Sequence, residues 1–325
     1  MLSSSGVATH KQMDRSDEPG STERVMSLPA DRSWLSHRLR GAQTGALMAV
    51  ASMSCVQLAL ALSVHLFGQL SPVGVAGLRL VWAGLLLLIL VRPHPSEFTP
   101  QDLRLCCILG VVTAGLMLFF MLAIARIPLG TASALEFLGP LTVSLYGPGS
   151  GRKRWTVMAA AGVILLTQPW HGGIDPAGLA FAAAAGACWG SYILLTQHVG
   201  DRVTGLSGLA VSMPVAGAAA VVVVLLVDGP SVVGRVTWHV LLVMLGLAVL
   251  HPVLTFTLEY LSLRGLTAKA FGTLMSLEPA IALLAGLLVL GQMPSAASAL
   301  GVIFVVIAGI GAIRTGARAP AQPAA

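Results

Sequence analysis

The sequence predicts an all-α membrane protein with ten transmembrane helices, arranged as two inverted five-helix repeats. Three observations support this fold class. Hydrophobic residues make up 56% of the 325 residues and charged residues only 10%, whereas soluble domains carry about 25% charged residues. Apolar runs close to the ~20 residues that cross a bilayer recur along the chain. A stretch of the first half returns, without a gap, in the second half.

The apolar runs predict helices, because they are continuous and lack the alternation of a barrel strand. Backbone polar groups cannot stay unpaired in lipid, so each run must satisfy its own hydrogen bonds. The predicted spans, in chain order, are 44–66, 72–91, 103–125, 128–147, 155–169, 177–199, 206–227, 238–260, 266–290 and 295–313.

The internal repeat aligns Ile127–Gly162 with Leu266–Gly301. Both copies place an acidic residue before a proline, Glu136 in one and Glu278 in the other. Each half holds five predicted helices, an odd number, so the second half must enter the membrane from the opposite side. Inverted repeats of this kind hold a substrate site near the midplane in secondary transporters. The alignment places Leu135, Leu138, Pro140, Leu145, Gly147 and Gly162 on Leu274, Leu277, Pro279, Leu284, Gly286 and Gly301.

The chain divides into four predicted segments. Residues 1–42 are rich in Ser, Asp, Glu, Arg and Pro, and we expect a disordered cytoplasmic tail without a signal peptide. Residues 43–176 form the first five-helix repeat and 177–315 the second, and 316–325 form a second disordered tail.

The net charge of +6 follows the predicted topology. With the N-terminus inside, only Arg126 and Arg235 among the basic residues near the spans fall outside, so the positive-inside rule places both termini in the cytoplasm of a multi-pass plasma-membrane protein. This distribution excludes nucleic acid as a partner. The basic residues on the cytoplasmic side are Arg38, Arg40, Arg92, Arg104, Arg152, Lys153, Arg154, Arg202, Arg264, Arg314 and Arg318.

No pattern of enzyme chemistry is present. The sequence lacks HExxH and nucleophile-elbow motifs, a phosphate-binding glycine loop and an Asp within a predicted span. Its four cysteines have no metal-ligand spacing. We therefore expect no enzymatic activity, no metal and no cofactor.

Arg79, Glu136 and Glu278 are ionisable residues inside predicted spans, where a charge costs ~2.5–3.5 kcal/mol on insertion scales. Arg79 could hold a substrate carboxylate through paired N–H donors, pair with a glutamate, or extend to the membrane surface. Each glutamate could bind a substrate ammonium, carry a proton, or bond to a neighbouring helix. Pro140 and Pro279 free a backbone carbonyl one turn earlier and could act as hinges.

Two further groups of residues are candidates for the site. Trp189, Tyr192 and Thr196 share one face of the sixth predicted helix, and Gln57 with Ser54 lies on the first. They could line a polar route or only pack between helices. Gly147 and Gly286 are expected to serve helix packing. His251 could carry a proton, but a structural hydrogen bond explains it as well. Glu259 could reach Arg264 or Lys269, and we expect it to be structural.

Three segments carry a family resemblance: Gly186–Gly200 (GACWGSYILLTQHVG), Ala134–Leu141 (ALEFLGPL) and Ser276–Ser295 (SLEPAIALLAGLLVLGQMPS). Together they resemble the EamA-type branch of the drug/metabolite transporter superfamily, in its threonine/homoserine exporter subgroup. The similarity spans about 42–315, and the sequence departs from it at Gln292, where the family usually has an acidic residue. The resemblance implies an inner-membrane exporter of small amino acids, driven by proton exchange.

The sequence therefore predicts a secondary transporter that exports threonine- or homoserine-like amino acids by proton antiport and alternating access. Its expected partners are the substrate, a coupling proton and membrane lipid. The sequence is also compatible with a homodimer. Two alternatives remain: a drug, purine or sugar-phosphate transporter of the same fold, and a non-transporting membrane sensor.

Overall fold

A computed structural model of the chain describes residues 32–145, 152–168, 175–200, 202–203, 206–255, 258–259, 261–262, 266 and 268–315. These residues form helices joined by short connections, and no strand occurs among them. Within this part of the chain, six helices are long and apolar enough to cross a membrane, and the segments Trp238–His251 and Ala296–Ala312 are shorter apolar helices. The all-α membrane class is therefore confirmed, while the count of ten spans stays a prediction.

The first half contains the helices α1 (Arg32–Val64), α2 (Pro72–Val91), α3 (Pro100–Ile124), α4 (Leu129–Glu136), α5 (Leu138–Leu145) and α6 (Arg152–Thr167). The second half contains α7 (Pro176–Gly200), α8 (Ser207–Val227), α9 (Trp238–Ala248), the π-helix η3 (Val249–Leu254), α11 (Ala268–Met275), α12 (Glu278–Leu290) and α13 (Ala296–Thr315). Short 3₁₀ turns lie at Pro95–Glu97 (η1) and Pro230–Arg235 (η2). Side-chain caps fix several of these starts, because Ser71, Thr99 and Thr237 accept hydrogen bonds from backbone N–H groups of α2, α3 and α9.

The fourth and ninth predicted spans are each broken at the same place in the repeat. The fourth span is interrupted at Phe137, between α4 and α5, and the ninth at Ser276 and Leu277, between α11 and α12. Each break lies just before the proline, Pro140 or Pro279, that removes a helical N–H donor. The two proline interruptions that the repeat predicts are therefore present in the structure.

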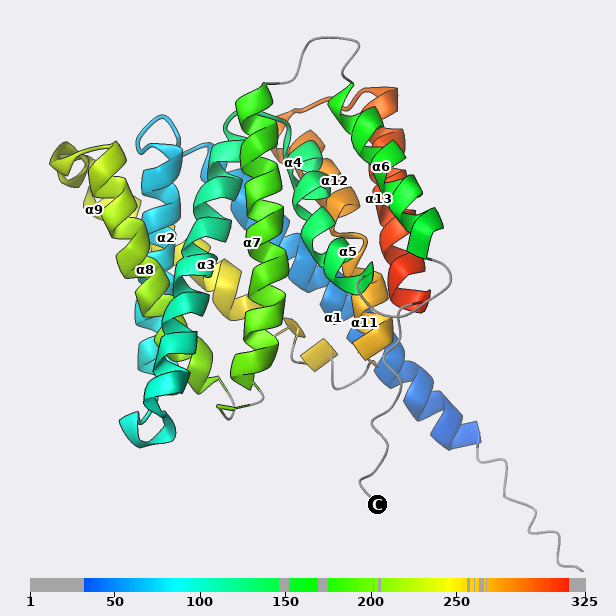
Figure 1. Cartoon of the computed structure of the whole chain (residues 1–325), viewed down its shortest axis with the longest axis horizontal. Coiled ribbons are helices and arrows are strands. Elements are labelled where there is room, and N and C mark those ends of the chain that lie inside the picture. Colours follow the sequence, from blue (N-terminus) through cyan, green and yellow to red (C-terminus); the bar gives the residue numbers. More distant parts are fainter. Residues whose placement is uncertain are drawn as a thin grey trace, which may run out of the picture.

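Helices of one half pack against their counterparts in the other half. α2 lies along α8, α4 along α12 and α6 along α13 (Figure 1). At the crossing of α6 and α13, a Cβ added to Gly162 would lie 2.9 Å from the carbonyl oxygen of Gly301, and one added to Gly301 would lie 2.8 Å from that of Gly162. Gly162 and Gly301 are partners in the repeat alignment, so this contact is isologous and marks the pseudo-two-fold axis of an inverted repeat.

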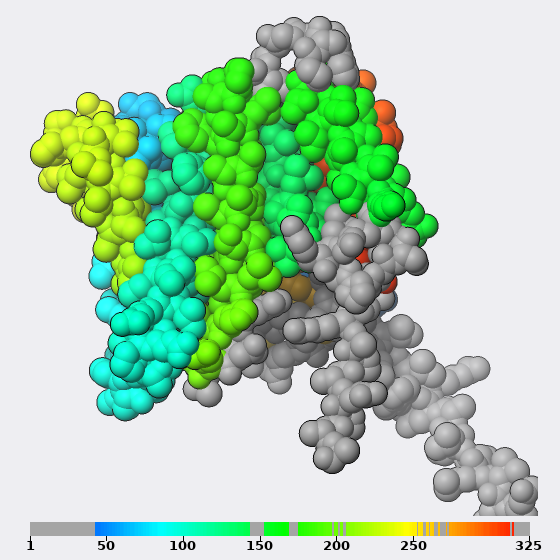
Figure 2. All heavy atoms as spheres, in the orientation of Figure 1, coloured from blue at the N-terminus to red at the C-terminus, as the bar shows by residue number. Residues whose placement is uncertain are grey.

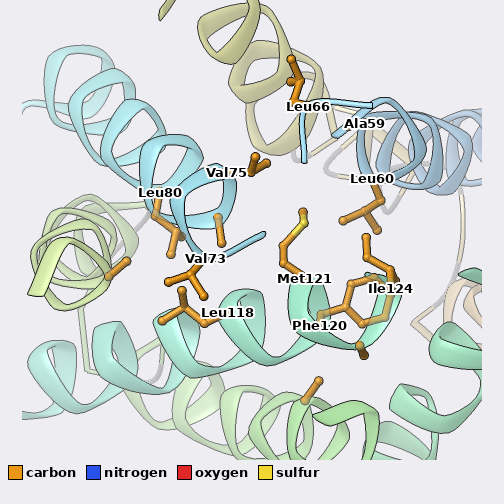
Figure 3. Packing of buried hydrophobic residues seen from close by; sticks show 14 of the residues in the cluster. Ala59, Leu60, Leu66, Val73, Val75, Leu80, Leu118, Phe120, Met121 and Ile124 are labelled. Atoms are coloured by element: carbon orange, nitrogen blue, oxygen red, sulfur yellow. The ribbon is translucent and has the colours of Figure 1, made fainter. Parts of the chain in front are cut away.

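An apolar cluster closes the upper end of the bundle in Figure 1, opposite the start of α1 and the end of α13. It joins the upper ends of α1, α2 and α3, and Figure 3 shows Phe120, Met121 and Ile124 of α3 directed toward Leu60 and Val75. Van der Waals packing of this kind holds helices together where lipid offers no hydrophobic driving force.

The outer surface of the bundle is apolar. Figure 2 shows α3, α7 and α6 on the near face, with the fourth span between α7 and α6. Large exposed side chains of these helices include Ile108, Val111, Val157, Ile164 and Leu194. Such a surface suits contact with acyl chains rather than water.

Two predicted boundaries differ from the structure. α1 begins at Arg32, earlier than residue 44. The eighth predicted span, 238–260, is not a continuous α-helix, because α9 ends at Ala248 and η3 follows, with His251 at φ −144° and ψ 109°. Pro252 explains this change, because it lacks an N–H and pushes the preceding residue out of the helical region.

Candidate functional site

A cavity of about 240 Å³ lies between the two halves of the bundle. Five residues predicted for the site line it: Arg79, Glu136, Trp189, Tyr192 and Glu278. The other lining residues are Val56, Leu60, Leu80, Ala83, Thr113, Leu116, Met117, Phe120, Met213, His251, Thr255, Glu259 and Met275. Residues from both repeats and from at least seven helices therefore line one cavity. The sequence alone does not show that these distant residues come together.

Arg79 of α2 is held by neutral partners. Its side chain is buried, with 2% of its surface exposed, so it does not extend to the membrane surface. Nη1 donates to Ser63 Oγ at 3.2 Å, and Nη2 lies 3.0 Å from His251 Nδ1. Because a guanidinium can only donate, His251 accepts at Nδ1 and carries its hydrogen on Nε2. Nε of Arg79 has no partner among the described residues, so one cationic donor remains free.

Glu278 starts α12 and is joined to α1 through Gln57. The Nε2 group of Gln57 donates to Glu278 Oε1 at 3.2 Å. Both side chains are buried, and Gln57 Oε1 and Glu278 Oε2 have no hydrogen-bond partner in the described part of the chain. A buried acceptor without a donor costs ~1–3 kcal/mol. Two such acceptors beside each other form a place where a ligand with several donors would be stabilised.

Glu136 ends α4, directly before the break at Phe137, and it is buried. Pro140 leaves the carbonyl of Glu136 without its helical donor, and this carbonyl faces Gly186 of α7, whose added Cβ would lie 2.9 Å from the oxygen. In the repeat alignment, Met275 stands opposite Glu136, and Gly139 stands opposite Glu278. The two carboxyl groups therefore lie at different levels of two related helices and are not symmetry mates.

Trp189 and Tyr192 of α7 form an aromatic wall of the cavity. The Trp189 ring meets Phe137 edge to face, with centroids 6.1 Å apart and an interplanar angle of 71°. Phe137 occupies the break in the fourth span, so this contact fixes the wall against the interrupted helix. Such aromatic pairs contribute ~0.5–1.5 kcal/mol beyond area burial.

Ser52 and Ser63 contribute to the site and were not singled out by the sequence, whereas His251 and Glu259 were considered without these partners. Oε1 of Glu259 accepts from Ser52 Oγ at 3.2 Å. Its expected bonds to Arg264 or Lys269 fall on side chains outside the described residues. His251 was considered only as a lone histidine, and its partner Arg79 is 172 positions away in the sequence. The position of His251 directly before Pro252 was the available signal in the sequence, and the two serines carried none.

The residues assigned to packing fall into three groups. Pro140 and Pro279 follow the two breaks, and Gly147 lies outside the described residues. Gly286 is buried, and a Cβ there would lie 2.8 Å from Oε1 of Gln292. The same oxygen accepts the backbone N–H of Leu129 at 3.0 Å and so caps α4. Gly286 therefore leaves room for a loop side chain that holds the start of the interrupted helix.

No group of three or more His, Cys, Asp or Glu residues that could hold a metal ion occurs within the described ranges. The polar groups that line the cavity are instead one guanidinium, one imidazole, one indole, three carboxyls and three hydroxyls. This set suits a small ligand that carries both a carboxylate and a donor-rich cation.

Comparisons with known proteins agree with this architecture. The chain is 33% identical over 282 residues to the threonine/homoserine exporter RhtA of Salmonella typhimurium, covering 84% of this chain and 92% of that protein. It is 34% identical over 251 residues to the protein of the same name from Escherichia coli K12, covering 75% and 82%.

A crystal structure that is described only as that of a protein superposes with a TM-score of 0.57 at 18% identity, covering 83% of this chain and 96% of the other. This likeness concerns the fold alone. The model of the EamA-like transporter family matches residues 43–167 and 176–314, one range in each half. With both of its halves matched in this way, the chain belongs to the EamA-like transporter family.

Proposed function

We propose that this protein exports small zwitterionic amino acids, of the threonine and homoserine type, across the plasma membrane by proton antiport and alternating access. The observation that carries the proposal is the cavity between the halves, where a buried guanidinium and buried carboxyl groups keep hydrogen-bonding atoms without partners. The relatives described as threonine/homoserine exporters, at 33% and 34% identity, support the substrate class.

Arg79 is the proposed site for the substrate carboxylate. Ser63 and His251 orient its guanidinium without neutralising it, and Nε remains available. Charge-assisted hydrogen bonds from arginine to a carboxylate are shorter and stronger than neutral ones. The buried guanidinium therefore favours binding of substrates that carry an anionic group.

The substrate ammonium is proposed to bind a carboxyl group on the opposite side. Glu136 and Glu278 both line the cavity, and Glu278 with Gln57 offers two acceptors that lack donors. An ammonium has three N–H donors, so it can satisfy both of these acceptors and still reach a third. Trp189 and Tyr192 would enclose the small side chain.

The coupling proton follows from the count of charges in the cavity. Three carboxyl groups line it, against one side chain with a fixed positive charge among the described residues. Like charges that share a water-poor site do not all ionise together. A zwitterionic substrate adds no net charge, so the cavity is expected to hold a proton and to exchange it during transport.

Efflux of a labelled amino-acid panel from cells with and without the protein tests this proposal. We expect faster efflux of threonine or homoserine, and loss of the difference on addition of a proton uncoupler. Glu136→Gln should abolish export while the protein still reaches the membrane, because an amide can neither balance an ammonium nor release a proton. Normal export by membrane-inserted Glu136→Gln would contradict the role of Glu136.

A transporter of cationic drugs is the second candidate function. The excess of carboxyls over cations in the cavity favours it over a sugar-phosphate carrier, because a phosphate requires several cationic partners and Arg79 is the one fixed cation among the described lining residues. Unchanged efflux of every amino acid in the panel, with efflux of a cationic dye, would favour this candidate.

A further inference from the structure

Beside the cavity, a hydrogen bond of Ser52 links α1 to the segment after η3. Ser52 Oγ lies 3.3 Å from the backbone oxygen of Thr255 and 3.2 Å from Oε1 of Glu259. Ser52 and Thr255 are buried, and Thr255 and Glu259 line the cavity. Thr255 and Glu259 follow the irregular turn of His251, so they lie on the section of the eighth span beyond its break.

A serine hydroxyl has one hydrogen, and both of these neighbours are acceptors when Glu259 is ionised. Ser52 can then donate to Glu259 or to the Thr255 carbonyl, but not to both. When Glu259 is protonated, its own hydroxyl can donate to Ser52 Oγ, and Ser52 can donate to Thr255. The complete chain from Glu259 through Ser52 to the Thr255 backbone therefore forms only in the protonated state.

We propose that Glu259 binds and releases the coupling proton, and that Ser52 links its protonation state to the contact between α1 and the eighth span. This inference rests on the proposed function, and it separates the proton site from the substrate site at Arg79, Glu136 and Glu278. Protonation adds a bond between α1 and the backbone beyond the π-helix, and proton release removes that bond.

The partner of Glu259 distinguishes it from Glu278. Ser52 changes from donor to acceptor by rotating one hydrogen, whereas the Gln57 amide can keep donating to Glu278 Oε1 while Oε2, which has no partner among the described residues, takes up a proton. Protonation of Glu259 can therefore change a bond to α1 without moving heavy atoms of its partner, whereas protonation of Glu278 leaves its bond to α1 in place. The other titratable and charged side chains facing this cavity are Arg79 of α2, Glu136 of α4, Tyr192 of α7, His251 of η3 and Glu278 of α12.

Proteoliposomes that contain the whole protein test the inference. A pH gradient drives uptake of labelled threonine, or of the amino acid that the efflux panel identifies, and exchange of labelled for unlabelled substrate is measured without a gradient. Glu259→Gln should lower gradient-driven uptake by about tenfold or more, a typical size for a lost coupling between sites, and should retain exchange. Glu97→Gln, on an exposed 3₁₀ turn, is the matched control and should behave as wild type.

Two results would overturn the inference. Gradient-driven uptake by Glu259→Gln at the wild-type level would show that the coupling proton binds elsewhere. Loss of exchange together with uptake, in variant protein that unfolds at the wild-type temperature, would place Glu259 in the substrate site. If the pH gradient does not drive uptake by the wild-type protein, although that protein exchanges substrate, the proton coupling in the proposed function is wrong. The inference is then wrong as well.

A measurement without substrate keeps the two failures apart. The unfolding temperature of purified protein in detergent, followed against pH, should contain a titration in wild type that Glu259→Gln lacks and that Ser52→Ala shifts in midpoint. Curves of identical pH dependence in wild type and Glu259→Gln would overturn the inference even if the transported substrate proves to be a drug.

Discussion

Arg79 is kept at membrane depth by two neutral partners rather than by an acidic one. A charge at the bilayer centre costs ~2.5–3.5 kcal/mol on insertion scales, and hydrogen bonds to Ser63 and His251 offset part of this cost. Neither partner cancels the charge. The residue therefore stays attractive to an incoming anion, as a binding site requires and a structural ion pair would prevent.

Replacement of Arg79 by lysine should reduce export by about 10-fold or more, because an ammonium lacks the planar fork that can bond to Ser63, His251 and a carboxylate together. The KM for export should rise in the same variant. Arg92→Lys is the control, since Arg92 is exposed at the end of the same helix. Export rates at several internal substrate concentrations provide the measurement, and an unchanged KM in Arg79→Lys would remove the carboxylate site from Arg79.

Much of the candidate site was predictable from single residues, for one physical reason. Ionisable groups are rare in apolar spans, so Arg79, Glu136 and Glu278 stand out in the sequence, and all three line the cavity. The serines that bond to ionisable groups, Ser63 to Arg79 and Ser52 to Glu259, did not stand out, because serine also serves ordinary helix packing. Their roles depend on contacts across 16 and 207 positions of sequence. Whether these residues bind substrate stays a prediction.

At the scale of elements, the crossing of the fourth span with α7 depends on the absence of side chains. A Cβ at Gly139 would overlap the carbonyl oxygen of Gly186, and one at Gly190 would lie 3.3 Å from the carbonyl oxygen of Gly139. The glycines bring the break at Phe137 against the helix that carries Trp189. The aromatic wall of the cavity therefore depends on backbone-to-backbone contact one turn away.

Gly139→Ala should destabilise the protein by ~1–3 kcal/mol, the usual cost of overpacking. Gly246→Ala is a suitable control, because nothing lies within 4 Å of a Cβ at that position of α9. The control should be neutral or slightly stabilising, since alanine favours a helix over glycine by up to ~1 kcal/mol. Thermal unfolding in detergent measures both, and equal unfolding temperatures would contradict the close crossing.

The element boundaries were predictable wherever an apolar run ends at a capping residue or proline. α2 begins at Pro72 as predicted, behind Ser71, and α8 ends at Val227 as predicted. The π-helix at Val249–Leu254 was not predictable from hydropathy, because a broken and an intact helix can bury the same apolar residues. Only Pro252 indicated it, and proline inside a membrane helix is often tolerated without a break, as at Pro214 within α8.

At the scale of the whole molecule, each half covers surfaces of the other. α2 pairs with α8, and Ser71 at the start of α2 donates to the carboxylate of Asp228, which follows α8. On the same upper end, Arg126 donates to Asp175 at 2.9 Å, and this hydrogen bond lowers the pKa of the Asp175 carboxyl. The halves thus meet along α2 and α8 and at the start of α2, whereas the Arg126–Asp175 pair lies within the first half.

The proposed topology, with both termini in the cytoplasm, predicts the behaviour of fusion proteins. Green fluorescent protein joined after residue 325 should fluoresce, because it folds in the cytoplasm. The same reporter joined after Val236, in the connection that precedes α9, should remain dark, whereas alkaline phosphatase at that site should be active. Whole-cell fluorescence and phosphatase activity supply the measurements, and a fluorescent Val236 fusion would reverse the orientation.

The two repeats have related backbones, but their carboxyl groups stand at different positions. This difference affects the free energies of the conformations. If the halves exchanged roles during a transport cycle and were identical, the inward-open and outward-open forms would have equal free energy and equal populations. In the repeat alignment, Glu136 corresponds to a methionine and Glu278 to a glycine. An exchange of roles would therefore move each carboxyl into a different environment. Under the proposed alternating access, a few side chains then set the free-energy difference between the two forms, and this difference biases which side of the membrane the empty protein faces at rest.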